Sequence, residues 1–144
     1  MKKALITGIT GQDGSYLSEF LLEKNYEIWG MYRRSSVDKH FERIGHLEWK
    51  INLVCGDLFD LCSVHRIVEN IKPDEIYNLA AQSQVRSSFD QPHLTYETNW
   101  LGVERLLDVI GKNVPKSKFY QASTSEMFGD AIETPQNENT PFNP

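Results

Sequence analysis

Apolar residues in this 144-residue chain gather in short segments separated by helical stripes. The segment at 3–7 is a short apolar run that predicts a buried strand, and further strands are predicted at 26–32, 52–55, 75–79 and 118–122. Between them, apolar residues recur every three or four positions and predict helices at 12–24, 61–71 and 94–110. A weaker helix is predicted at 37–47. Asn25, Pro73 and Pro115 stand where the three clearer helices should stop.

Each of these three helices has an apolar face that we expect to be buried. The expected buried residues are Leu17, Phe20 and Leu21 in the first helix, Leu61, Val64, Ile67, Val68 and Ile71 in the second, and Trp100, Val103, Leu107 and Ile110 in the third.

The alternation of strands and helices predicts an α/β fold, with a doubly wound parallel sheet in the order 3-2-1-4-5. No repeat or linker divides residues 1–144, so we expect one domain. The tail 131–144 contains prolines and no periodic element. Because such a domain would continue with at least one more strand, we expect an incomplete Rossmann domain, truncated before its last strands and lacking a C-terminal substrate domain.

Composition narrows the classes of function. The net charge of −5, with acids and bases interspersed, argues against nucleic acid as the main partner. No apolar run is long enough to span a membrane, and the run at 4–6 is too short for a signal peptide, so we expect a cytoplasmic protein. Cys55, Cys62 and the four histidines lack metal-ligand spacing, so no metal is expected, and the cysteines are expected to be packed thiols.

The turn after the first strand is a G-x-x-G-x-x-G loop that opens a helix. Its glycines suit a tight turn, close approach of a pyrophosphate and close helix packing, and the helix N-terminus favours phosphate. We predict a dinucleotide site that includes Gly8, Thr10, Gly11, Gln12, Asp13 and Gly14. The alternatives are a glycine-rich turn without a ligand, and Asp13 as a helix cap.

The second strand runs into Arg33, Arg34 and Ser35, where NAD-binding domains normally carry an acid for the ribose 2′-OH. Guanidinium and hydroxyl groups suit a 2′-phosphate, so NADP is predicted as the cofactor. The alternative is a solvated basic loop.

Turns after the third and fourth strands supply further candidate residues. Asp57 is placed to accept from the adenine amino group and Leu58 to pack on the ring, although Asp57 or Asp60 could instead cap the next helix. Leu79, Ala80 and Ala81 would let a cofactor lie against the backbone, and Ser83 would reach its ribose or the substrate. A small-residue packing turn is the alternative there.

After the fifth strand, the nicotinamide end of the cofactor is expected near Thr124, Ser125 and Glu126. A hydroxyl and a carboxylate two residues apart suit proton transfer on a bound substrate. The alternative is a polar turn with Glu126 in solvent.

Together these segments resemble the extended short-chain dehydrogenase/reductase family, and its GDP-mannose 4,6-dehydratase branch in particular. The resemblance is carried by TGITGQDGSYL (7–17), YRRSS (32–36), GDL (56–58), PDEIYNLAAQSQV (73–85), SFDQP (88–92) and ASTSEMFG (122–129). It implies a lyase that uses bound NADP to oxidise GDP-mannose at C4, eliminate water across C5 and C6, and reduce C6.

By this resemblance Thr124 would bond the C4 hydroxyl, Glu126 would remove the C5 proton, and Ser83 and Ser125 would contact substrate. It also implies a homo-oligomer, a dimer or tetramer. The chain departs from the family in two ways: it lacks the family's Tyr-x-x-x-Lys pair, and Leu94 stands where relatives often carry tyrosine. We therefore expect this chain alone to bind cofactor weakly and to be inactive.

Three alternative functions stay open: an epimerase or reductase of the same family, a dehydratase acting on another nucleotide sugar, and a non-catalytic NADP-binding module. Thr124 and Glu126 favour a dehydratase, because epimerisation at C4 needs no acidic side chain acting at C5.

Overall fold

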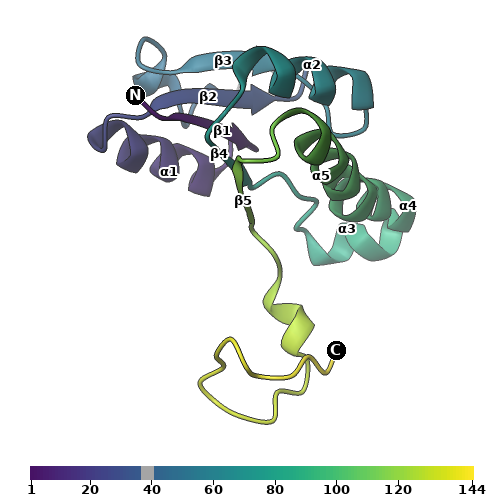
Figure 1. Cartoon of the computed structure of the whole chain (residues 1–144). Coiled ribbons are helices and arrows are strands. Elements are labelled where there is room, and N and C mark those ends of the chain that lie inside the picture. The colour runs from purple at the N-terminus through teal and green to yellow at the C-terminus, as the bar shows by residue number, and fades with distance from the viewer. Residues whose placement is uncertain (37–40) are drawn as a thin grey trace.

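Strand β1 (Lys3–Thr7) lies at the centre of a parallel sheet in the computed structural model, which describes residues 1–36 and 41–144 (Figure 1). The other strands are β2 (Glu27–Tyr32), β3 (Asn52–Cys55), β4 (Glu75–Asn78) and β5 (Lys118–Gln121). Their order is β3-β2-β1-β4-β5, so the predicted doubly wound topology is confirmed. Ala4 pairs with Ile28 of β2 on one side and with Glu75 of β4 on the other. The order in which successive strands are added to the sheet therefore reverses at β1.

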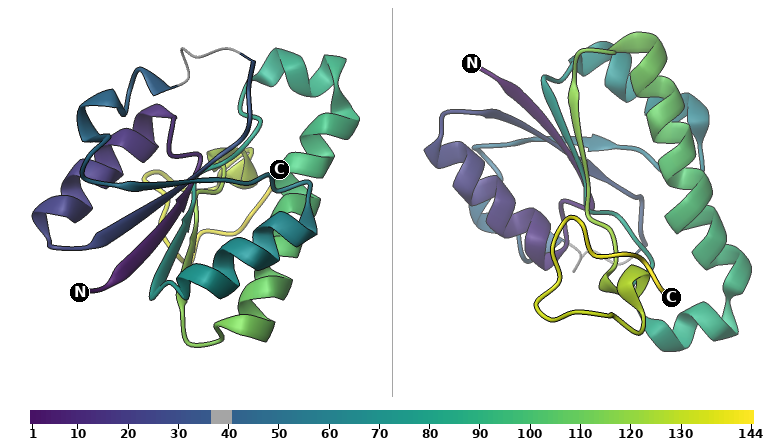
Figure 2. Two further views of the ribbon diagram at one scale, coloured as in Figure 1. Left: turned by 90° about the horizontal axis from the view of Figure 1, so that it is seen from above. Right: turned by 60° about the horizontal axis from the view of Figure 1, so that its bottom comes forward.

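Helices cover both faces of the sheet (Figure 2). On one face, α1 (Gln12–Glu23) packs with the short 3-10 turn Gly45–Leu47, where Leu21 and Leu47 meet Ala4 and Ile6. On the other face, α2 (Leu61–Ile71) and α5 (Gly102–Asn113) bury their apolar stripes against Leu5 and Ile76. Because β1 is buried on both faces, its sequence reads as a continuous apolar run.

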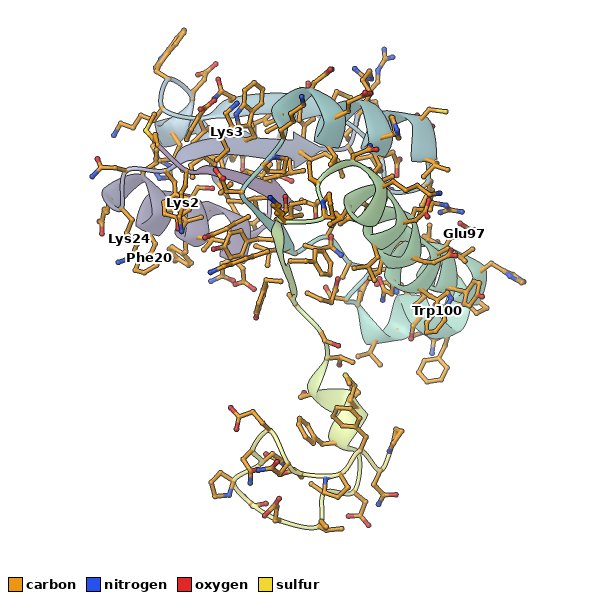
Figure 3. All side chains as sticks on the ribbon, in the orientation of Figure 1. Lys2, Lys3, Phe20, Lys24, Glu97 and Trp100 are labelled. Atoms are coloured by element: carbon orange, nitrogen blue, oxygen red, sulfur yellow. The ribbon has the colours of Figure 1, made fainter. Side chains whose placement is uncertain are left out.

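Helix α1 contacts the sheet through small residues. Its buried positions are Gly14, Ser15, Ser18 and Leu21, so the helix axis lies close to β1. The prediction that Phe20 is buried is therefore wrong. Phe20 lies beside this buried stripe and is exposed, and the Lys24 ammonium lies 4.5 Å from the centroid of its ring (Figure 3).

Helix α2 has the predicted bounds and buries four of its five predicted residues. Leu61 is the exception. It is the first residue of the helix, at the edge of the layer, and its side chain is exposed.

The predicted helix at 94–110 is wrong in its start and in most of its buried face, although Ile110 is buried as predicted. The chain forms α3 (Val85–Asp90), α4 (Pro92–Tyr96), a π-helical turn at Glu97–Leu101, and then α5. The face toward α2 and the sheet consists of Gly102, Leu106, Val109 and Ile110. Two neighbouring stripes of this helix are apolar, and the one carrying Trp100 and Leu107 is exposed.

The remaining segments differ modestly from expectation. Of the predicted helix at 37–47, residues 37–40 lie outside the described part of the chain. The rest forms successive turns, which include the 3-10 helix Gly45–Leu47. Cys55 and Cys62 are exposed thiols instead of the predicted packed ones. Cys55 is the last residue of the edge strand β3, and Cys62 lies in the first turn of α2.

After β5 the chain leaves the sheet, forms a 3-10 turn at Ser125–Phe128, and closes a loop with Phe128 against Phe142 (Figure 1). In the described residues, no helix has the length and apolarity needed to cross a membrane.

Candidate cofactor-binding site

A cleft of about 550 Å³ opens at the carboxyl ends of the strands, beside the point where the strand order reverses. Doubly wound sheets bind their ligands at this position. Apart from Arg34 and Ser35, every residue predicted to bind cofactor lines the cleft: Gly8, Thr10, Gly11, Gln12, Asp13, Gly14, Arg33, Asp57, Leu58, Leu79, Ala80, Ala81 and Ser83. Four turns that are distant in sequence are thus brought together.

Two glycines of the first turn are required by the backbone. Gly8 has φ +69°, and a β-carbon there would lie 2.8 Å from the Ala80 amide nitrogen. A β-carbon on Gly14 would lie 2.6 Å from the Gly8 carbonyl oxygen. The predicted tight turn and the close packing of the helix are therefore present.

The N-terminus of α1 faces the cleft without a side-chain cap. Its N-cap residue is Gly11, which has no side chain to accept from the first-turn N–H groups, and Gln12, Asp13 and Gly14 line the cleft. The capping alternative for Asp13 is not observed within the described residues. Uncapped N–H groups and the positive end of the helix dipole fit a diphosphate. Gly11 has no side chain that would occupy the space of the diphosphate.

The end of β2 supplies Met31, Tyr32 and Arg33 to the cleft wall. Arg34 and Ser35 follow in an exposed loop and do not line the cleft. One guanidinium group therefore borders the cleft directly, and the second lies just beyond it in sequence.

The turn after β3 separates the two aspartates that compete for the capping role. The N-cap of α2 is Asp60, whose carboxylate accepts from the Cys62 amide at 3.0 Å. Asp57 Oδ1 accepts from the Phe59 amide at 3.0 Å, and the Asp57 backbone is held by the buried hydroxyl of Ser63. Asp57 is thereby kept at the cleft instead of at the helix end.

The turn after β4 is tied to the helices that follow it. Asn99, in the π-helical turn, accepts from the Gln82 amide at 2.8 Å and donates to the Gln82 carbonyl at 2.9 Å. Leu94 and Thr98, one helical turn apart, complete this wall of the cleft. Leu94 therefore occupies a cleft position, although it departs from the family's frequent tyrosine.

A buried polar network joins the ends of β1, β4 and β5. The Thr7 hydroxyl accepts from the Ala80 amide and donates to the Asn78 side chain. The Asn78 amide donates to Gln121 Oε1 at 2.7 Å. Because Thr7 and Asn78 are fully buried, this network fixes the place where the chain leaves β5.

Beyond β5, the predicted catalytic residues lie in an exposed turn. Thr124 is the N-cap of the 3-10 turn and accepts from the Glu126 amide at 3.2 Å. Thr124, Ser125 and Glu126 do not line the cleft. The structure thus brings the cofactor residues together but leaves this trio outside their pocket.

The cleft lining also contains Met31, Tyr32, Phe59, Gln82, Leu94 and Thr98, which were not predicted to bind the cofactor. Gln82 could have been found, since it lies between Ala81 and Ser83, which were predicted. Leu94 and Thr98 carry no motif, and only the path of the chain after α3 brings them to the site. No group of three or more His, Cys, Asp or Glu side chains that could hold a metal occurs in the described residues.

Comparisons with known proteins agree with this geometry. Residues 5–144 match the sequence model of the GDP-mannose 4,6 dehydratase family. The chain is 52% identical to a GDP-mannose 4,6-dehydratase of Yersinia enterocolitica, covering 100% of this chain and 41% of that protein. It is 51% identical to the Drosophila melanogaster enzyme of the same name, covering 99% of this chain and 38% of that protein. This chain therefore spans about two fifths of these relatives' length.

Among solved structures, the chain resembles the UDP-glucose 4-epimerase of Bifidobacterium longum in complex with NAD+ and UDP. The TM-score is 0.84 at 26% identity, over 99% of this chain and 43% of the epimerase. The shared architecture is consistent with the doubly wound parallel sheet described above. With the family match over nearly its whole length, the chain belongs to the GDP-mannose 4,6-dehydratase family.

Proposed function

We propose that this chain is the cofactor-binding part of an enzyme that converts GDP-mannose to GDP-4-keto-6-deoxymannose with bound NADP. The observation that carries the proposal is the cleft at the switch point of the sheet, where the glycine loop, Arg33, Asp57 and the small-residue turn after β4 meet. The family match supplies the reaction, and the cleft supplies a place for its cofactor.

The choice of NADP rests on the end of β2. Arg33 borders the cleft where an acid would favour the free 2′-OH of NAD, and Arg34 and Ser35 follow it. The B. longum neighbour is in complex with NAD+, so the preference needs its own test. We expect Arg33→Gln to weaken NADP binding about tenfold and to change NAD binding little, because one charge-assisted contact is lost. Equal losses for both cofactors would contradict the assignment.

In the proposed reaction, the residues that line the cleft would hold NADP, and bound NADP would supply hydride transfer, from C4 of the sugar and later back to C6. Thr124 would bond the C4 hydroxyl and orient it. Glu126 would remove the C5 proton, which the neighbouring 4-keto group makes acidic, and would pass it to the departing C6 hydroxyl. Ser83 and Ser125 would contact the sugar nucleotide. The Thr7–Asn78–Gln121 network supports these roles by fixing the start of the segment that carries them.

The test uses a longer protein, in which this chain is extended to the full length of its relatives. This protein is incubated with GDP-mannose and NADP in deuterated water. We expect a 4-keto-6-deoxy product, detected by mass, with solvent deuterium at C5. Glu126→Gln should lower the rate at least about a hundredfold, as loss of a general base does. Glu138→Gln is the matched control, because Glu138 is an exposed carboxylate further along the same segment. Undiminished turnover by Glu126→Gln would remove that residue from the mechanism.

Other outcomes separate the alternatives. Tight NADP binding with intact GDP-mannose would favour another nucleotide sugar or a non-catalytic module, and inversion at C4 without loss of water would favour an epimerase. We expect the 144-residue chain to bind NADP weakly and to show no turnover, because it lacks a Tyr-x-x-x-Lys pair. Its cytoplasmic location stays a prediction.

The longer protein is further proposed to form a homo-oligomer. The proposal is supported by an apolar stripe on the helical segment 92–113 that the described residues leave uncovered. Tyr96, Trp100 and Leu107 are 54%, 65% and 48% exposed. The amphipathic pattern predicts that Trp100 and Leu107 of this stripe are buried, and a second copy of the chain would bury them.

A further inference from the structure

The π-helical turn Glu97–Leu101 interrupts the helical segment directly beside the cofactor cleft. It adds a residue to the helical path between α4 and α5, so side chains on its two sides point in directions that one regular helix would not allow. Such insertions are often found at functional sites. The turn carries two residues, Glu97 and Asn99, that bond to other elements.

Asn99 holds the turn after β4 by its backbone. Its side-chain amide pairs with both the N–H and the carbonyl of Gln82, at 2.8 and 2.9 Å. The Gln82 side chain adds a second tie, donating to Thr95 Oγ1 at 3.1 Å. Since Gln82 lies between Ala81 and Ser83, these bonds determine where the turn borders the cleft.

Arg105 holds the turn after β3 from the same helical segment. Its guanidinium donates to the Leu58 carbonyl at 3.3 Å and to the Glu97 carboxylate at 3.0 Å. The Arg105 side chain is mostly buried. One residue of α5 also lies against Leu58: a β-carbon on Gly102 would be 3.1 Å from the Leu58 β-carbon. The segment therefore contacts both turns.

We propose that the π-helical turn, with Arg105, is a brace that sets the separation of the two cleft walls, and that Asn99 and Arg105 are positioning residues for the cofactor. Through Asn99 the brace fixes the wall formed by the turn after β4, and through Arg105 the wall at Leu58. Thr98 of the brace, and Leu94 one helical turn before it, line the cleft between the two walls. This inference rests on the proposed cofactor function.

The two residues act on different parts of a dinucleotide. Asp57 and Leu58 are the candidate contacts for adenine, while the turn after β4 is placed toward the nicotinamide half. Loss of the Asn99 bonds should therefore weaken binding of NADPH but not of adenosine 2′,5′-bisphosphate, which lacks that half. Loss of Arg105 should weaken both ligands, because Leu58 belongs to the part that they share.

The experiment measures the affinities of the 144-residue chain for these two ligands by titration, with protein amide NMR signals to detect weak binding. Asn99→Ala should raise the Kd for NADPH about tenfold, the effect of two lost hydrogen bonds, and leave that of the bisphosphate within about twofold. Arg105→Met should raise both about threefold. Asn70→Ala, an exposed asparagine on α2, is the matched control and should change neither.

The ratio of the two affinities separates positioning from general loss of structure. A merely destabilised Asn99→Ala protein would lose both ligands in proportion, and this outcome, or unchanged binding of both, would overturn the brace. If the unaltered chain binds neither ligand, the proposed cofactor function fails and the brace fails with it. If the unaltered chain binds both ligands, and Asn99→Ala leaves the ratio of the two affinities unchanged, the brace alone is refuted.

Discussion

Glu75 is a buried carboxylate at the start of β4, at the opposite edge of the sheet from the cofactor cleft. It accepts from Tyr77 at 2.8 Å, Lys2 at 3.1 Å and Tyr26 at 3.2 Å. Burial raises the pKa of Glu75, but these hydrogen bonds and the charge of Lys2 outweigh burial and lower the pKa overall. The charged form is thus maintained inside the fold, where it ties β1, β2 and β4 together.

The same cluster predicts how stability changes at alkaline pH. Burial, and then the hydrogen bond and charge of Glu75, raise the pKa of Tyr77 from 10.0 to about 12. The folded protein therefore keeps the phenolic proton where the unfolded chain loses it, so the contribution of Tyr77 is complete below pH 10 and declines toward pH 12. Glu75 also raises the pKa of Lys2, which acts in the same direction.

We expect Tyr77→Phe to lower the free energy of unfolding at neutral pH and to flatten its decline above pH 10. The measurement is denaturant unfolding at a series of pH values. Tyr120→Phe is the control, because this ring is the neighbour of Tyr77 on β5, with centroids 6.1 Å apart. Equal alkaline slopes for Tyr77→Phe and the unaltered chain would show that the phenol does not carry the effect.

At the scale of elements, the turn from β3 to α2 divides two tasks between two aspartates. Asp60 caps the helix, and Asp57 remains at the cleft. Asp60→Ala should lower the free energy of unfolding by about 1 kcal/mol, the usual cost of a lost N-cap, without a specific effect on NADP binding. Asp57→Ala should weaken NADP binding with a smaller change in stability.

Thermal unfolding and NADP titration of both variants check this division. Asp60→Asn keeps an N-cap acceptor and should restore most of the lost stability. The division would be wrong if Asp57→Ala were the more destabilising change, or if Asp60→Ala selectively impaired NADP binding.

The elements differ in how far sequence could predict them. The strands were predicted within one residue, because a central strand such as β1 in a parallel sheet reads as an apolar run with sharp limits. The segment from Val85 to Asn113 could not be predicted in the same way. One inserted residue in the π-helical turn changes the direction of everything that follows, and the helix carries two adjacent apolar stripes between which hydropathy alone does not choose.

At the scale of the whole molecule, the candidate site was largely predictable because most of its lining residues lie at or just after the ends of strands. The topology of a doubly wound sheet brings the ends of β1, β2, β3 and β4 to one edge, so residues after the strands converge without any further signal. Asn99 and Arg105 were not predicted, since they act on backbone groups of other turns and such pairings leave no pattern in a sequence. The turn of Thr124 and Glu126 lies outside the cleft, so its roles stay a prediction.

The exposed stripe of Tyr96, Trp100 and Leu107 is the feature that the proposed assembly would explain. Trp100 lies on the outer surface of the helical segment (Figure 3), and Tyr96 before it and Leu107 after it are also exposed. Two copies related by a two-fold axis would bury the same stripe twice, which is how most homodimers are built.

We expect the chain to associate at high concentration, and Trp100→Asp to shift it to the monomer, because a charge would then have to be buried in an apolar contact. Sedimentation velocity over a range of concentrations measures this directly. Phe20→Asp is the matched control: Phe20 is also an exposed aromatic residue, but it lies on α1, away from the stripe, and already contacts Lys24. A chain that stays monomeric at every concentration, or one that Phe20→Asp dissociates as readily as Trp100→Asp, would exclude this stripe as the self-association surface. Association lost only in Trp100→Asp would assign the apolar face that the described fold leaves open to a second copy of the chain.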